Sequence, residues 1–185
     1  MQPDFVWIKS RNDTDNHRLV DSVRGATKHM ESDGSGAEQT SSNVKTFTST
    51  GVTLSTNGSV NANSELYASW AWKAGTAFSN DASSTSIGSI DSTGSVSTAA
   101  GFSIISWTGD GNDGATIAHG LGATPAIVIT KRRDDTGDWL VGGSLINTAR
   151  GGANSLLLLN TTAAMDNNSE VYQTFSSTTF QVGVN

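Results

Sequence analysis

The chain has 185 residues, a net charge of −6 and a sequence pI of about 4.8. Its eleven Lys and Arg residues are dispersed, which argues against nucleic-acid binding, because such binding depends on clustered positive charge. No apolar run approaches the ~20 residues that span a bilayer as a helix, and cysteine is absent, so stability owes nothing to disulfides. Hydrophobic residues are few, at 35 %, but so are charged residues, at 15 %; with abundant Ser, Thr, Asn and Gly this predicts a β-rich fold rather than disorder.

The first predicted element is a strand at the start of the chain. Alternation places Phe5 and Trp7 on one face of it, and Val6 and Ile8 on the other. An Asn- and Asp-rich turn at 12–16 and a second strand at 17–23 complete a hairpin. Further strands are predicted, in chain order, at 44–47, 51–55, 66–73, 102–108, 116–119, 126–132, 139–142, 155–159, 171–175 and 179–184.

An internal repeat is the most informative feature of the sequence. The segment 3–14 matches 125–136 without a gap, with six of twelve positions identical. After a one-residue slip, Leu19-Val20 falls on Leu140-Val141, and 47–54 corresponds to 175–182. Three matches in the same order indicate a duplication. We therefore expect an all-β protein of two tandem antiparallel β-sandwich units, jelly-roll-like, related by internal duplication.

The expected organisation is unit 1 over 1–75, a linker over 76–100 and unit 2 over 101–185. The linker prediction follows from the Ser, Thr, Gly and Ala content of 76–100, which cannot bury a core of its own. Unit 2 begins with a strand pair, 101–107 and 115–119, that unit 1 lacks. Unit 1 ends with an aromatic strand, 65–73, that unit 2 lacks. Either the chain is a fragment of a longer protein, or neighbouring subunits complete each other's sheets by strand exchange.

The glycine-rich motifs predict turns rather than active sites. The run 119–122, His-Gly-Leu-Gly, lacks the strand–loop–helix context and the lysine of a phosphate loop, so we expect a tight turn that uses glycine at positive φ. The run 109–114 resembles part of a calcium loop, and Asp110, Asn112 and Asp113 are weak metal candidates. The distal bidentate acid is missing, so a hairpin turn is the preferred interpretation and no metal or other cofactor is expected.

No catalytic constellation is evident. His17, Asp21 and Ser22 could be assembled into a triad on paper, but nothing places them around a nucleophile elbow. Glu31, Glu38 and Glu65 could supply paired carboxylates, whose separation sequence does not give. We therefore expect a protein that is not an enzyme.

The aromatic strand near the end of unit 1 offers the best binding candidates. Tyr67, Trp70 and Trp72 carry flat faces suited to stacking on sugars. Trp70 and Trp72 share one face of the strand, and Tyr67 lies on the opposite one. The competing interpretation, which the sequence favours, puts the Trp pair in the core.

Several segments together resemble a known family. The run 2–11, Gln-Pro-Asp-Phe-Val-Trp-Ile-Lys-Ser-Arg, with His17 to Ala26, is similar to a domain of marine tailed phages. The runs 67–75 and 101–109 are similar to the segments that follow that domain, and 119–125 resembles a His-Gly-Leu-Gly…Pro element of phage fibres. The Tyr-Thr-Gly-Asn-Gly lead-in usual in that family is absent here.

This resemblance implies a structural or adhesive protein of the virion surface: a tail fibre, host-attachment or capsid-appendage component. It would work by assembly and multivalent binding, outside the cell on the phage particle. The partners implied are other copies of the chain, with a homotrimer as first expectation, other virion proteins and host surface glycans, without nucleic acid or membrane insertion. The alternatives are a carbohydrate-binding lectin module and a bacterial surface adhesin or filament subunit.

Overall fold

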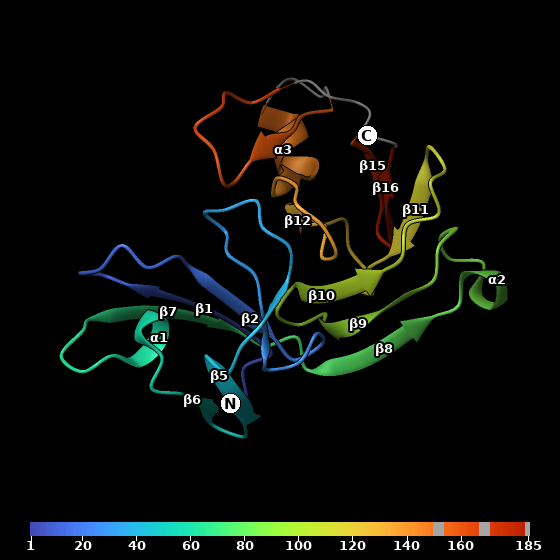
Figure 1. The fold of residues 1–185 in the computed structure, drawn as a ribbon. Helices are drawn as coiled ribbons and strands as arrows, with labels where there is room; N and C mark the ends of the chain where they lie inside the picture. The colour runs from blue at the N-terminus through green and yellow to red at the C-terminus, as the bar shows by residue number, and fades with distance from the viewer. Residues whose placement is uncertain (150–153, 167–170, 184–185) are drawn as a thin grey trace. The chain divides into compact units, whose positions relative to one another are not determined.

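A computed structural model describes residues 1–149, 154–166 and 171–183 (Figure 1). Strands dominate it and the helices are single turns or little more, so the all-β prediction is confirmed. The strands are β1 (Phe5–Ser10), β2 (Arg18–Asp21), β3 (Lys28–His29), β4 (Gln39–Thr40), β5 (Val44–Thr48), β6 (Gly51–Leu54), β7 (Tyr67–Trp72), β8 (Thr76–Asn80), β9 (Ser92–Ser97), β10 (Phe102–Trp107), β11 (Ala115–Ala118), β12 (Val128–Thr130), β13 (Leu140–Gly142), β14 (Leu157–Leu158), β15 (Tyr172–Phe175) and β16 (Thr179–Val182). The helices are α1 (Gly58–Asn61), α2 (Ala82–Thr85) and α3 (Ser144–Ala149), and within the described ranges none has the length and hydrophobicity to cross a bilayer.

The chain forms two compact units with a discontinuous boundary. Unit 1 comprises Met1–Ala74 and Lys131–Trp139, and unit 2 comprises Gly75–Thr130 and Leu140–Asn185. The second segment of unit 1 is the long turn between β12 and β13. Residue Val184, at the end of the last predicted strand, lies outside the described residues.

Unit 1 is built on the antiparallel sheet β2-β1-β7. Its two faces carry separate apolar clusters, as alternation along β1 predicts. Val6 and Ile8 face one cluster, with Val20, Val44 and Val60. Phe5 and Trp7 pack against the other, formed by Leu19, Met30 and Trp139. Apolar clusters of unit 1 therefore pack against both faces of the sheet at β1 and β2.

Unit 2 contains three three-stranded antiparallel sheets, in the orders β10-β9-β8, β11-β16-β15 and β12-β13-β14. Its core gathers around Ile117, Tyr172 and Phe180, all almost fully buried. The Tyr172 hydroxyl lies 2.6 Å from the Thr130 hydroxyl, so the buried phenol is hydrogen-bonded.

The predicted linker over 76–100 is folded, which corrects the sequence-based expectation. β8 pairs with β9 along its length, from Thr76 opposite Val96 to Asn80 opposite Ser92. β9 also pairs with β10, so it is the central strand of its sheet. Ser92 and Ser95 are buried there, and the Ser92 hydroxyl donates to the Ala118 carbonyl at 3.0 Å. The small polar side chains that suggested a linker are the ones that let these strands approach closely.

The expected pairing of the strands at the start of unit 2 is also wrong. β10 pairs with β9 rather than with β11, and β11 pairs with β16 near the end of the chain. Both strands exist where the alternation predicts them. Their partners are set by tertiary packing, which local pattern does not encode.

The matched hairpins of the two units have equivalent geometry. Trp7 lies opposite Leu19 in the first hairpin, and Ile129 lies opposite Val141 in the second, so the match continues without the one-residue slip. The turns also agree: Lys9 Nζ donates to the carbonyls of Ser10 and Asp13 at 2.6 and 3.0 Å. Lys131 Nζ makes the same two contacts, to Arg132 and Asp135, at 2.8 and 3.4 Å.

The hairpins β5–β6 and β15–β16 agree in the same way. Phe47 lies opposite Val52 and Phe175 opposite Phe180, and both hairpins have a register shift just before this pair. The surroundings differ: β11 lies beside β16, whereas the corresponding sheet of unit 1 contains only β5 and β6. Conversely β7 lies beside β1, whereas the order β12-β13-β14 leaves β12 at an edge.

Candidate functional site

An aromatic surface covers one face of the β1–β7 pair. Trp7 lies directly opposite Trp70, and Phe5 directly opposite Trp72. The rings of Trp7 and Trp70 meet edge-to-face with centroids 6.1 Å apart, and those of Phe5 and Trp72 with centroids 5.3 Å apart. Opposed aromatic pairs of this kind stabilise adjacent strands and fix ring orientation. We call Phe5, Trp7, Trp70 and Trp72 the aromatic surface.

The β1 half of the aromatic surface packs against buried neighbours. Trp7 Nε1 donates to His17 Nδ1 at 2.7 Å, and the two rings also meet edge-to-face at 5.6 Å. Buried Leu19, Met30 and Trp139 pack against Phe5 and Trp7 on this same face of the sheet, and Trp139 Nε1 donates to the Glu31 carbonyl at 2.8 Å. A platform that is ordered before binding loses little side-chain entropy when a ligand arrives.

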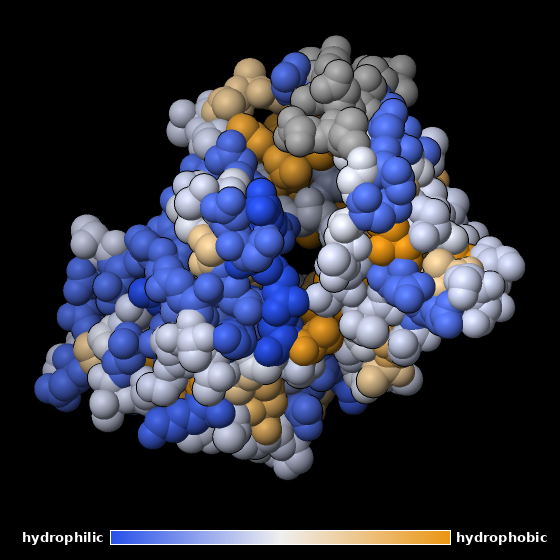
Figure 2. Space-filling model, turned by 45° about the vertical axis from the view of Figure 1, so that its right-hand side comes forward, coloured by the Kyte–Doolittle hydropathy of each residue, from blue (hydrophilic) through white to orange (hydrophobic). Residues whose placement is uncertain are grey.

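The β7 half of the aromatic surface faces solvent. Trp70 is 49 % exposed and Trp72 38 % exposed, so the interpretation that placed this pair in the core is wrong. The reason is topological, because β7 is an edge strand: in the part of the chain that the structure describes, β1 is its single neighbouring strand. On the face drawn in Figure 2, hydrophobic residues form separate patches within a largely hydrophilic surface.

Tyr67 is not part of the aromatic surface. It lies on the opposite face of β7, as predicted, and packs against the Val6–Ile8 cluster. Its hydroxyl donates to the Gly58 carbonyl and accepts the Ala62 N–H at 2.9 Å, so it anchors α1. The structure thus separates Tyr67 from Trp70 and Trp72. The structure brings three further residues, Phe5, Trp7 and His17, to the two tryptophans. The Phe-x-Trp pattern of β1 and the Trp-x-Trp pattern of β7 would have indicated the two aromatic residues of β1 if the pairing of these strands had been known.

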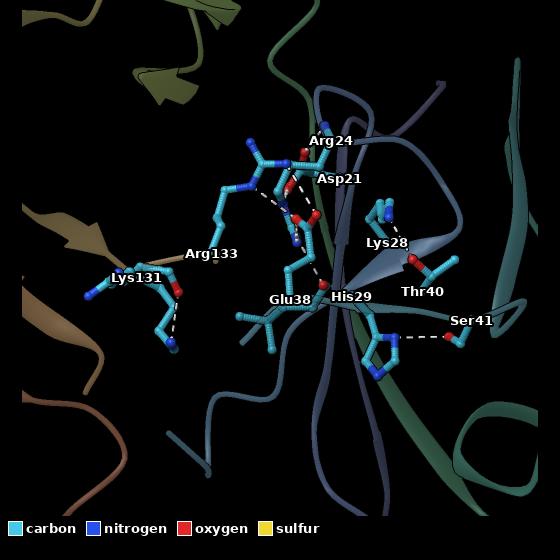
Figure 3. A network of polar contacts seen from close by, with 11 residues as sticks. Asp21, Arg24, Lys28, His29, Glu38, Thr40, Ser41, Lys131 and Arg133 are labelled. Carbon is cyan, nitrogen blue, oxygen red and sulfur yellow. Dashed lines mark hydrogen bonds and ion pairs between the residues drawn. The ribbon is translucent and has the colours of Figure 1, made fainter. Parts of the chain in front are cut away.

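A network of charged residues forms a second cluster in unit 1 (Figure 3). Glu38 accepts hydrogen bonds from Arg24 Nη1 at 3.1 Å and from Arg133 Nε at 3.0 Å, and Arg24 also pairs with Asp21. The side chains of Arg24, Asp21 and Glu38 are nearly buried. Burial tends to raise the pKa of Glu38, but hydrogen bonds from Arg133 and Arg24 outweigh it and hold that pKa below its ordinary value.

This charged network binds the turn Lys131–Trp139 to the rest of unit 1. The Glu38 N–H donates to the Arg133 carbonyl at 2.8 Å, and the Gly137 N–H donates to the Ser35 carbonyl at 2.9 Å. The charged groups of Asp21, Arg24, Glu38 and Arg133 are thus paired with one another within unit 1. The arrangement is that of a structural anchor.

The other sequence candidates are used in local structure. Asp110 accepts from the backbone and side-chain nitrogens of Asn112, and these bonds lower its pKa. The Asp113 carboxylate accepts from Gln173 Nε2 at 2.8 Å. Among the described residues, no three His, Cys, Asp or Glu side chains gather as a metal site would require.

The triad considered from the sequence is not assembled. His17 accepts from Trp7, Asp21 pairs with Arg24, and the Ser22 hydroxyl donates to Asp4 Oδ1 at 3.2 Å. Of the glutamates considered, Glu31 pairs with Arg18, and Glu38 pairs with Arg24 and Arg133. Glu65 differs, because its Oε2 is buried without a hydrogen-bond partner among the described residues.

The His-Gly-Leu-Gly run forms the expected tight turn, with Gly120 and Gly122 at φ 71° and 72°. His119 is almost fully buried and accepts the Leu121 N–H at Nδ1, 3.2 Å away. Its Nε2 lies 3.2 Å from the Ser176 carbonyl, and this pairing requires the neutral Nε2–H tautomer. Burial lowers the pKa of His119, although the bond to Ser176 opposes that effect. His119 is therefore a structural histidine of the unit 2 core.

Fold and site together define an all-β protein of small antiparallel sheets that displays a partly exposed aromatic surface. Comparison with known proteins adds a family. A family model described as a domain of unknown function (DUF7483) matches residues 1–185, and the chain belongs to that family. No curated protein and no solved structure matches the chain.

Proposed function

We propose that this protein is a structural and adhesive component of a phage virion surface, such as a tail fibre, host-attachment or capsid-appendage protein, and that it acts without catalysis. The observation that carries the adhesive part is the aromatic surface, in which Trp70 and Trp72 of β7 are partly exposed beside Phe5 and Trp7 of β1, which pack against buried neighbours. The phage assignment rests on the sequence resemblance. Host surface glycans are the proposed ligands, because apolar sugar faces stack on aromatic rings.

We also propose that both units descend from one duplicated sandwich module of jelly-roll type. The equal registers of the matched hairpins and the equal lysine contacts in their turns support this origin. The open edges of β6 and β12 support assembly with other chains, with a homotrimer as the first expectation. Multivalent display would then turn weak sugar contacts into firm attachment.

Glycan-array binding by the full chain tests the adhesive role. We expect binding to at least one class of glycan, and a loss of tenfold or more in Trp70→Ala and Trp72→Ala. Both rings are partly exposed, so each variant should stay folded, with a stability loss near 1 kcal/mol. Leu66→Ala, an exposed apolar residue just before β7, is the matched control. Binding that survives both tryptophan substitutions would reject the aromatic surface as the ligand site.

A further inference from the structure

The outer edge of β12 lacks a neighbour that its counterpart possesses. β12 ends its sheet in the order β12-β13-β14, whereas the matching strand β1 is central in the order β2-β1-β7. Within the described ranges, no strand occupies beside β12 the place that β7 occupies beside β1. A sheet edge of this kind presents backbone donors and acceptors to any strand that fits it.

The side chains on β12 and just before it also lack the covering residues that their counterparts on β1 have. Ile127 and Ile129 match Phe5 and Trp7, which pack against Trp72 and Trp70. Ile127 is 51 % exposed and Ile129 47 % exposed, although Val128 between them packs into the unit 2 core. Two isoleucines side by side on an open strand edge are unusual on a free surface and mark a contact site.

The hydrogen-bonding pattern of β1 and β7 indicates which backbone groups of β12 point to its open edge. The Arg11 N–H donates to the Leu66 carbonyl across β1 and β7 at 2.7 Å. Alternation along antiparallel strands then directs the backbone groups of Trp7 toward β7, opposite Trp70. Ile129 matches Trp7, so its N–H and carbonyl point to the open edge, while Val128 and Thr130 bond to β13.

We propose that the open edge of β12 binds a β7-type strand of a partner chain: an extended segment with two aromatic residues two positions apart, added in antiparallel direction. The inference rests on the assembly role proposed above and specifies its contact. Exchange of β7 between copies would uncover one β1 edge for each β12 edge that it covered. The occupant is therefore a β7-type strand other than β7 itself, and it would cover Ile127 and Ile129 as Trp72 and Trp70 cover Phe5 and Trp7.

A fluorescent peptide with the sequence of residues 65–73, titrated into the full chain and followed by anisotropy, tests this contact. We expect saturable one-to-one binding, weakened at least tenfold by Ile129→Asp and by the double variant I127S/I129S. Ile87→Asp changes another exposed isoleucine of unit 2 and should leave the affinity unchanged. Replacing both tryptophans of the peptide by serine should abolish binding.

Backbone methylation of the peptide separates strand addition from hydrophobic adsorption. An N-methyl group on the residue equivalent to Trp70 blocks the edge that faces β12 and should cost at least tenfold in affinity. The same group on the residue equivalent to Ser69 faces away and should be tolerated.

Three results would overturn the proposal. The first is the absence of saturable binding up to about 1 mM peptide. The second is equal binding by wild type and Ile129→Asp, which would place the peptide on β1. The third is self-association of the chain that Ile129→Asp abolishes, which would make the occupant a second copy. Glycan binding is read separately, so failure of either proposal leaves the other distinguishable.

Discussion

His119 shows how one buried residue sets the response of unit 2 to acid. Its ring bridges the Leu121 N–H and the Ser176 carbonyl, and only the neutral form satisfies both. Protonation would turn the accepting Nδ1 into a second donor facing the Leu121 N–H. Burial therefore favours the uncharged ring, and the bond from the Leu121 N–H fits only that form, whereas the bond to the Ser176 carbonyl opposes the effect of burial.

We expect stability to fall as pH drops below 6.5. The pKa of His119 in the folded chain is below its ordinary value of 6.5, because burial disfavours the charged ring. Below 6.5 the unfolded chain takes up this proton more readily than the folded chain, so the stabilisation is complete above 6.5 and declines toward the folded pKa. The pKa of His29 is also lowered, by burial first, and adds in the same direction.

Thermal unfolding of His119→Gln at pH 7.5 and at pH 5.5 measures this contribution. The difference in Tm between the two pH values should shrink relative to the wild type, even if the variant is less stable at both. Thr178→Ala, which removes a nearby hydroxyl without a titrating group, should keep the wild-type difference. An unchanged difference in His119→Gln would show that His119 does not titrate on unfolding.

At the scale of elements, the sheet β10-β9-β8 depends on the absence of a side chain at its centre. A Cβ at Gly94 would overlap the carbonyl oxygen of Ile104 on the neighbouring strand β10, and would also press on the Phe78 ring. Because Ile104 offers backbone rather than a movable side chain, the strands would have to separate.

We expect Gly94→Ala to lower the free energy of unfolding by about 3 kcal/mol, at the upper end of overpacking effects. Gly51→Ala is the matched control, since Gly51 also lies in a strand, but a Cβ added there would have no heavy atom within 4 Å. That control should stay within about 0.5 kcal/mol of wild type. Urea titration of both variants gives the comparison, and equal stabilities would contradict the close approach of β9 and β10.

The elements differ in how well sequence predicts them. β1 and β7 are placed within a residue or two, because buried and partly buried positions alternate along β1 and the tryptophans of β7 lie two positions apart. β8 and β9 escape prediction because Ser92 and Ser95 are buried without being apolar, so no periodicity marks them. The faces of Trp70 and Tyr67 follow from alternation, but the exposure of Trp70 depends on the edge position of β7, which is a property of the whole sheet.

At the scale of the whole molecule, distant parts of the chain share one unit through the turn Lys131–Trp139. Glu38 joins this turn to the body of unit 1, because its carboxylate meets both Arg24 and Arg133 and its N–H meets the Arg133 carbonyl. The Arg24 side chain is only 6 % exposed, whereas that of Arg133 is 43 % exposed. The two arginines therefore depend on Glu38 to different degrees.

We expect Glu38→Ala to cost about 3 kcal/mol of stability, because it leaves the buried Arg24 charge with Asp21 as its remaining carboxylate. Arg133→Ala should cost no more than about 1 kcal/mol, as for other solvent-exposed ion pairs. Hydrogen exchange gives the local readout: Glu38→Ala should speed exchange of the Gly137 N–H, which donates to the Ser35 carbonyl within the same anchor. Arg132→Ala, which removes only the exposed pairs with Asp134 and Asp135, should leave that exchange unchanged. If Gly137 exchanged at the wild-type rate in Glu38→Ala, the turn would be held by its apolar contact through Trp139 rather than by the charged network.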